Sequence, residues 1–118
     1  ATPEERKQMW CEVRERYLPW VDWGDLDYPG AGGRWQLQSH IYHVPFYYID
    51  YTLAQTCAMQ FWLRAEEDFD EAMSAYVELC KRGGSAPFLE LVKGAGLTSP
   101  FEPGCLESVA NRVREELF

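Results

Sequence analysis

Residues Phe46–Leu63 read FYYIDYTLAQTCAMQFWL, and this stretch decides the fold. Thirteen of its 18 residues are apolar, and Pro45 stands where it can open a helix. A helix that is apolar nearly all round is either buried in a protein or spans a membrane. Asp50 and the amides of Gln55 and Gln60 argue against the membrane. We therefore predict a central buried helix over residues 46–63.

A helix before this stretch is predicted from its first residues. Thr2 is a capping residue, Pro3 stands at the first helical position, and Glu5 can bond back to the capping amide. Apolar residues then recur at helical spacing until Pro19 ends the pattern. This predicts a helix from about Pro3 to Tyr17.

Three helices are predicted after the central one. Asp68 and Glu71 form another cap pattern, and the helix that follows stops at Gly83. Ser85 is placed to cap a short helix that ends near Gly94. The last helix is predicted from about residue 105 to residue 117 by its apolar spacing.

The rest of the chain shows no sign of a sheet. Residues 18–39 have no apolar period, which predicts a long loop that is functional or mobile. No alternating apolar run or hairpin turn is present. We therefore predict an all-α fold, with about five helices around the central one, in a single domain over residues 1–118.

Charge and cysteine usage limit the partners and the compartment. The chain has 11 basic and 19 acidic residues, with a net charge of −8. Nucleic acids and anionic membranes attract clustered positive charge, so we expect neither as a partner. The four cysteines form no Cys-x-x-Cys pair, and Cys57 and Cys80 fit apolar helical patterns as small buried side chains. With no signal-peptide pattern at the start, we expect a cytoplasmic location.

Histidines and tyrosines crowd together at the start of the central stretch. Phenol and imidazole groups need hydrogen-bond partners once they leave water, so a core would more easily use Leu, Ile or Phe. A polar aromatic wall that faces a cleft is the better interpretation. Its members are His40, Tyr42, His43, Tyr47, Tyr48 and Tyr51.

Three blocks of sequence carry a family resemblance. They are HIYHVPFYYIDYTLAQTCAMQFW at 40–62, KRGGSAPFLELV at 81–92 and AGLTSPFE at 95–102. In order and spacing they resemble the C-terminal part of oligoendopeptidase F, a zinc metallopeptidase related to thimet oligopeptidase. The resemblance implies the C-terminal part of a larger helical catalytic domain, a zinc ion in the parent enzyme and oligopeptides as substrates.

The resemblance also implies roles for individual side chains. By motif, His40, Tyr47 and Tyr48 are candidate catalytic residues that steady the tetrahedral intermediate, and Tyr42 and His43 are candidate substrate-binding residues. More distant relatives have a glycine-rich segment before the Tyr-Tyr pair, where this chain has His-Val-Pro-Phe. That departure leaves the division of roles between Tyr42 and His43 open.

The metal-binding motif of such a peptidase is missing. His-Glu-x-x-His places two imidazoles on one helix face, but here the only histidines are His40 and His43, without an adjacent glutamate. We therefore expect no metal ligand and no activity in this chain alone. Its partner would be the N-terminal catalytic portion, and the isolated chain is expected to dimerise through the surface around Tyr42, Phe46 and Tyr47, with Tyr51.

Two other functions fit the same residues. Trp20, Trp23 and Trp35 could join the tyrosines in an aromatic groove, which would make the chain an independent helical peptide-binding module. A purely structural interaction domain is the third reading. A parent chain with an upstream His-Glu-x-x-His motif would separate the first hypothesis from both.

Overall fold

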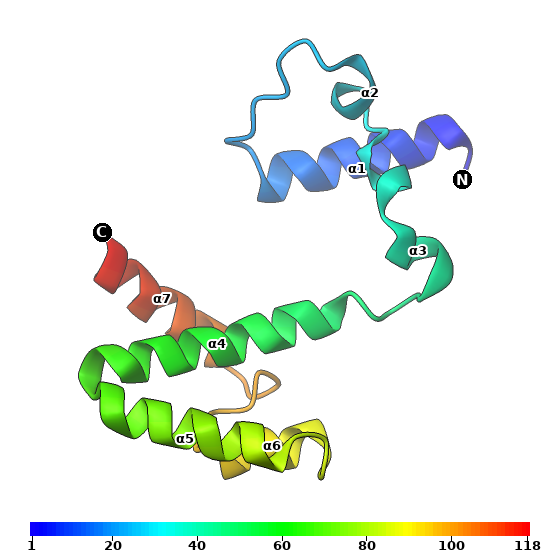
Figure 1. The fold of residues 1–118 in the computed structure, drawn as a ribbon. Helices are drawn as coiled ribbons and strands as arrows, with labels where there is room; N and C mark the ends of the chain where they lie inside the picture. Colours follow the sequence, from blue (N-terminus) through cyan, green and yellow to red (C-terminus); the bar gives the residue numbers. More distant parts are fainter. The chain divides into compact units, whose positions relative to one another are not determined.

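The computed structural model describes residues 1–118, and every element in it is helical (Figure 1). The all-α prediction is therefore confirmed. Contacts divide the chain into two compact units, Ala1–Tyr47 and Tyr48–Phe118. The single domain over residues 1–118 stays a prediction. The elements are α1 (Pro3–Tyr17), α2 (Asp27–Gly30), the 3₁₀ helix η1 (Arg34–Leu37), α3 (Ser39–His43), α4 (Ile49–Glu67), α5 (Phe69–Arg82), α6 (Phe88–Gly94) and α7 (Cys105–Leu117).

The first helix of the first unit forms as predicted. The hydroxyl oxygen of Thr2 accepts a hydrogen bond from the amide of Glu5 at 3.2 Å, and the Glu5 carboxylate accepts one from the amide of Thr2 at 2.7 Å. This reciprocal capping box satisfies two amides that a helix start leaves without partners. It places the start of α1 at Pro3.

The loop predicted over residues 18–39 is partly wrong, because α2 and η1 lie within it. Each is about one turn long, too short to produce an apolar period. Side chains of α1 hold this segment. The Arg14 guanidinium donates to the carbonyl oxygens of Pro29 and Gly30, at 3.2 Å each, and lies over the ring of Trp23. The buried Gly32 approaches α1 so closely that a Cβ atom there would lie 2.5 Å from the carbonyl oxygen of Lys7.

A turn separates α3 from α4, which corrects the predicted start of the central helix. The amide of Tyr47 donates to the carbonyl oxygen of Val44 at 3.2 Å, and Phe46 has a φ of +70°. A positive φ costs a residue with a Cβ atom about 1–3 kcal/mol. Pro45 therefore opens this turn and not the helix, and α4 begins at Ile49.

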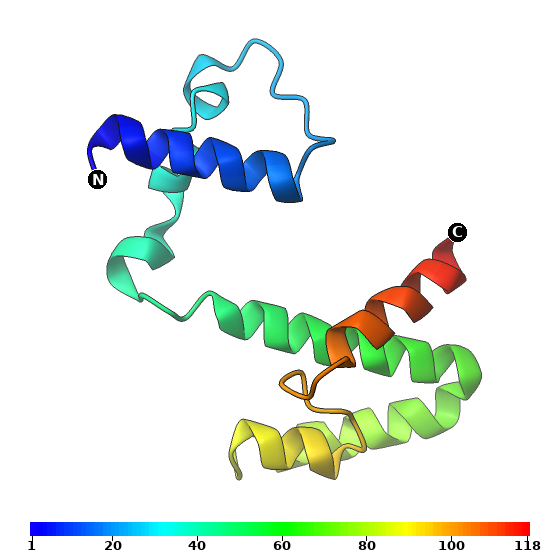
Figure 2. The same ribbon diagram turned by 180° about the vertical axis from the view of Figure 1, so that it is seen from behind.

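The second unit is a set of helices packed on α4. Figures 1 and 2 show α5 running beside α4 and α7 crossing α4 at an angle, and both helices contact it. The side chain of Asp68 accepts from the amide of Glu71 at 3.0 Å and caps α5 as predicted, and Gly83 ends it with a φ of +49°. Ser85 does not cap α6, since Pro87 is the residue before its first turn. The prediction for α7 is confirmed.

The core of the second unit is small. Val92, Ala95 and Leu97 are buried together, with Cys57, Phe61 and Leu79 packed against them. Of the residues in α4, only Thr56 and Leu63 are buried, so the prediction of a deeply buried central helix is wrong for this chain. The helices that contact α4 most are α5 and α7, and these two leave part of its surface exposed to solvent. Cys80 is also exposed, contrary to prediction, because it lies in the last turn of α5 beside exposed glycines.

None of the helices has both the length and the apolar character that a membrane-spanning segment needs.

Candidate functional site

Part of the predicted histidine and tyrosine cluster lies at the end of the first unit. The ring of His40, on α3, lies parallel to the ring of Tyr47, with an interplanar angle of 2° and centroids 6.3 Å apart. His40 is partly buried and Tyr47 is 49% exposed. The turn after α3, closed by the Tyr47 amide, lies between these two residues in sequence. An imidazole and a phenol are thus held side by side with access to solvent.

A second aromatic pair lies in the same unit. The ring of Tyr42 stacks on that of Trp35, with centroids 6.0 Å apart and an interplanar angle of 23°. Trp35 belongs to η1, so the 3₁₀ turn positions it against α3. Sequence reasoning assigned Trp35 only to the alternative aromatic groove, because an isolated tryptophan in an aperiodic segment gives no signal of its partner. His43 lies on α3 three residues after His40 and is exposed.

The remaining candidate residue belongs to the second unit. Tyr48 precedes the first turn of α4 and is 51% exposed. Its ring packs edge to face against Tyr51, with centroids 5.4 Å apart. The structure therefore brings His40 together with Tyr47 and Tyr42 with Trp35, and it places Tyr48 with Tyr51. Tyr47 and Tyr48 are adjacent in sequence yet fall on opposite sides of the unit boundary.

The chain offers no catalytic zinc site. A zinc ion in such an enzyme needs about three protein ligands, usually histidines with a carboxylate. No group of three or more His, Cys, Asp or Glu side chains comes together in a way that could hold a metal ion. The two histidines are the only imidazoles in the chain. The residues present therefore do not fit this metal.

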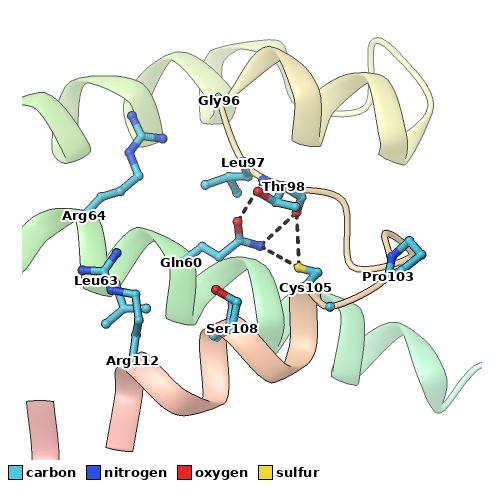
Figure 3. Close-up of a pocket in the computed structure, with 12 residues that line it drawn as sticks. Gln60, Leu63, Arg64, Gly96, Leu97, Thr98, Pro103, Cys105, Ser108 and Arg112 are labelled. Carbon is cyan, nitrogen blue, oxygen red and sulfur yellow. Dashed lines mark hydrogen bonds between the residues drawn. The ribbon is translucent and has the colours of Figure 1, made fainter. Parts of the chain in front are cut away.

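The second unit contains a cavity of about 390 Å³ between α4, α7 and the segment that joins α6 to α7 (Figure 3). Figure 3 shows the Gln60 amide bridging to that segment. It donates to the carbonyl oxygen of Thr98 at 3.0 Å and accepts from the Thr98 amide at 2.9 Å. Arg64 donates to the carbonyl oxygen of Ala95 at 2.8 Å and pairs with Glu71. These polar side chains hold the unit together.

The thiols of this region are not activated. Burial, together with the Glu102 carboxylate, raises the pKa of Cys105 above its usual value. Burial and the neighbouring Cys105 raise the pKa of Cys57 in the same direction. A nucleophilic cysteine requires a lowered pKa, because the thiolate is the reactive form. The cavity therefore has no cysteine nucleophile. The candidate residues are the aromatic side chains described above, His40, Tyr42, His43 and Tyr47 in the first unit and Tyr48 in the second.

Comparisons with known proteins identify the family. The model of the family described as Peptidase family M3 matches residues 1–111. The fold is similar to a crystal structure assigned as an oligoendopeptidase F, with 55% identity, a TM-score of 0.86 and coverage of 99% of this chain and 21% of that one. A structure of PZ peptidase A with an inhibitor gives 54% identity, a TM-score of 0.87 and coverage of 99% and 21%.

A third structure, assigned as an oligoendopeptidase F from Bacillus anthracis strain Ames, gives 46% identity, a TM-score of 0.72 and coverage of 99% and 17%. The chain thus spans about a fifth of the length of the solved structures it matches. The comparison with curated proteins finds no match. The resemblance to oligoendopeptidase F is confirmed, and the fold matches the helical C-terminal part of such an enzyme. The chain belongs to peptidase family M3.

Proposed function

We propose that this chain is the C-terminal segment of a zinc-dependent oligoendopeptidase, which hydrolyses peptide bonds in short peptides. The observation that carries the proposal is 54–55% identity over 99% of the chain to an oligoendopeptidase F and to PZ peptidase A, whose own chains are about five times longer. The similarity covers nearly all of this chain but only about a fifth of each related enzyme. A segment of such an enzyme explains this coverage better than an independent binding module does.

The stacked rings of His40 and Tyr47 support a role in stabilising the negative charge of the reaction intermediate. Attack on a peptide carbonyl puts negative charge on its oxygen, and hydrogen-bond donors held in place lower the energy of that state. The phenol of Tyr47 is such a donor, and its ring is stacked parallel to that of His40. Tyr48, packed against Tyr51, is the second candidate donor.

The Tyr42 and Trp35 pair supports a role in peptide binding. Stacked aromatic rings offer an apolar face, and the phenol and indole add polar edges that can bond a peptide backbone. Exposed His43, on the same short helix, adds an imidazole that can donate or accept. We assign Tyr42 and His43 to substrate binding, and His40, Tyr47 and Tyr48 to catalysis.

The zinc ligands belong to the remaining portion of the enzyme in this proposal, because the donor groups of this chain do not fit the metal. That portion is also the main protein partner. All four cysteines are free, which agrees with the reduced cytoplasmic location that we propose. Oligopeptides are the proposed substrates.

The test compares the isolated chain with the full-length enzyme that contains it. Zinc content is measured by elemental analysis, and turnover is measured with a quenched fluorescent peptide, with and without a chelator. We expect the full-length enzyme to hold about one zinc ion and to lose turnover with the chelator, and the isolated chain to show neither property. Stoichiometric zinc with chelator-sensitive turnover in the isolated chain would contradict the proposal, as would a full-length protein without peptidase activity.

A further inference from the structure

The turn before Tyr47 carries an aromatic residue where glycine is usual. Pro45 holds its second position and Phe46 its third, and a hydrogen bond from the amide of Tyr47 to the carbonyl oxygen of Val44 closes it. Proline at the second position with a positive φ at the third is the pattern of a type II turn, whose third residue is normally Gly or Asn. Phe46 has a φ of +70°. Phenylalanine is therefore an unfavourable choice for the backbone here.

Packing within the unit does not compensate for that choice. The side chain of Phe46 is 94% exposed, the highest value among the exposed large apolar residues apart from Phe118 at the end of the chain. A strained residue persists where the surrounding structure imposes it, and such residues cluster at ligand contacts. A strained backbone that holds an aromatic ring out into water points to a contact with another molecule.

The neighbours of Phe46 indicate which molecule that is. Tyr47 follows directly, and its ring stacks on that of His40, so the turn places Phe46 next in sequence to a stacked pair whose members can both donate hydrogen bonds. Under the proposed function those donors bind the backbone of a peptide at the bond that is cleaved. A side chain next to that bond would then lie within reach of Phe46.

We propose that Phe46 contacts an apolar side chain of the peptide substrate and gives the enzyme a preference for large apolar residues at that position. This inference rests on the proposed function. The competing explanation is that the ring packs against another part of the full-length enzyme. In that case its removal would lower stability and would affect all peptides alike.

The experiment uses the full-length enzyme with Phe46 replaced by Ala, Gly or Leu, and Phe101→Ala as the matched control. Phe101 is also a largely exposed phenylalanine, 62% exposed, but it lies in the second unit, outside the aromatic cluster. Substrates are quenched fluorescent peptides that differ only by Phe, Leu or Ala at one position, scanned on both sides of the cleaved bond. Thermal unfolding is measured for every variant.

At one position we expect Phe46→Ala and Phe46→Gly to lower the ratio of kcat/KM for the Phe peptide over the Ala peptide about tenfold, the size of a lost apolar contact. Phe46→Leu should keep part of the preference, Phe101→Ala should keep all of it, and the Tm of Phe46→Gly should not fall. An unchanged ratio at every position in an active enzyme overturns this inference alone. A lower Tm with equal loss for all peptides also overturns it, and assigns the ring to packing. An inactive wild-type enzyme removes the proposed function and this inference together.

Discussion

Gln60 and Thr98 lie 38 positions apart in sequence and are joined by two hydrogen bonds between the side-chain amide of one and the backbone of the other. The Gln60 amide nitrogen donates to the Thr98 carbonyl oxygen, and its oxygen accepts from the Thr98 N–H. A glutamine side-chain amide carries both a donor and an acceptor, so it can bond the carbonyl oxygen and the N–H of the same residue. The pair ties the segment between α6 and α7 to α4.

Replacing Gln60 by Leu should therefore destabilise the second unit. Both backbone groups of Thr98 would lose their partners, at a cost of about 1–3 kcal/mol in the free energy of unfolding. Gln55→Leu is the control, because Gln55 is exposed on the same helix, and its effect should stay within about 0.5 kcal/mol. Urea unfolding followed by circular dichroism measures both variants. Equal stabilities would show that the bridge contributes nothing.

Gly32→Ala should destabilise the first unit by about 1–3 kcal/mol. Gly32 has a φ of +81°, and a Cβ atom would lie 2.5 Å from the backbone oxygen of Lys7 and 2.8 Å from the Cys11 sulfur. The contact with the Lys7 backbone cannot be relieved without moving α1, although the Cys11 side chain can rotate away. Gly30→Ala is the matched control, since a Cβ atom at Gly30 would meet nothing within 4 Å. Thermal unfolding of both variants, monitored by tryptophan fluorescence, checks this, and equal Tm values would contradict it.

Stability of the second unit should fall at alkaline pH. Burial raises the pKa of Cys57 and Cys105 above the ordinary thiol value of 9.0, so the folded chain retains protons that the unfolded chain releases. Where the unfolded state binds fewer protons, the free energy of unfolding decreases as pH rises. The stabilisation is complete below pH 9 and is lost as pH rises through the folded pKa values. Unfolding measured from pH 7 to 10 should show this slope in the wild type and in Cys11→Ala, whose cysteine lies in the first unit, and a weaker slope in Cys57→Ala/Cys105→Ala. The same slope in all three would exclude the two thiols as its cause.

The isolated chain should associate at high concentration. Many of its large apolar side chains are exposed, among them Tyr42, Phe46 and Tyr47 in the first unit and Tyr51 in the second. Exposed apolar patches above a few hundred Å² promote association. Static light scattering over a concentration series should show a mass that rises from monomer to dimer, with binding of a hydrophobic dye. A monomer throughout, without dye binding, would mean that the isolated chain needs no partner and would favour an independent module.

Capping chemistry made several elements predictable from sequence. The Thr2 and Glu5 box and the Asp68 cap are local, so their residues identify the helix starts without knowledge of the tertiary structure. The start of α4 was not predictable in this way. Pro45 suits both the first turn of a helix and the second position of a turn, and the choice depends on a positive φ at Phe46 that no local preference indicates.

For the candidate site too, the residue types could be predicted from the sequence, but their spatial pairing could not. The residue types His40 and Tyr47 were named from sequence because a cluster of polar aromatics is unusual. Their parallel stacking depends on the turn between them, and the pairing of Tyr42 with Trp35 depends on η1, a single 3₁₀ turn without periodic signal. Extensive burial of α4 was predicted from its apolar pattern, but burial also requires neighbours, and this chain supplies only part of them.

The role of the tyrosine pair is tested most directly by the kinetics of two single variants of the full-length enzyme, Tyr47→Phe and Tyr48→Phe. Removing one hydroxyl leaves the ring and its packing in place. Loss of one donor to the developing oxyanion should lower kcat by roughly 10²–10³ while KM changes little, and only the tyrosine that faces the reacting carbonyl should show it. Tyr17→Phe is the control, because Tyr17 lies exposed at the end of α1. We expect a large loss of kcat in one of the two variants and none in the control, whereas wild-type kcat/KM in both would show that neither hydroxyl takes part in catalysis.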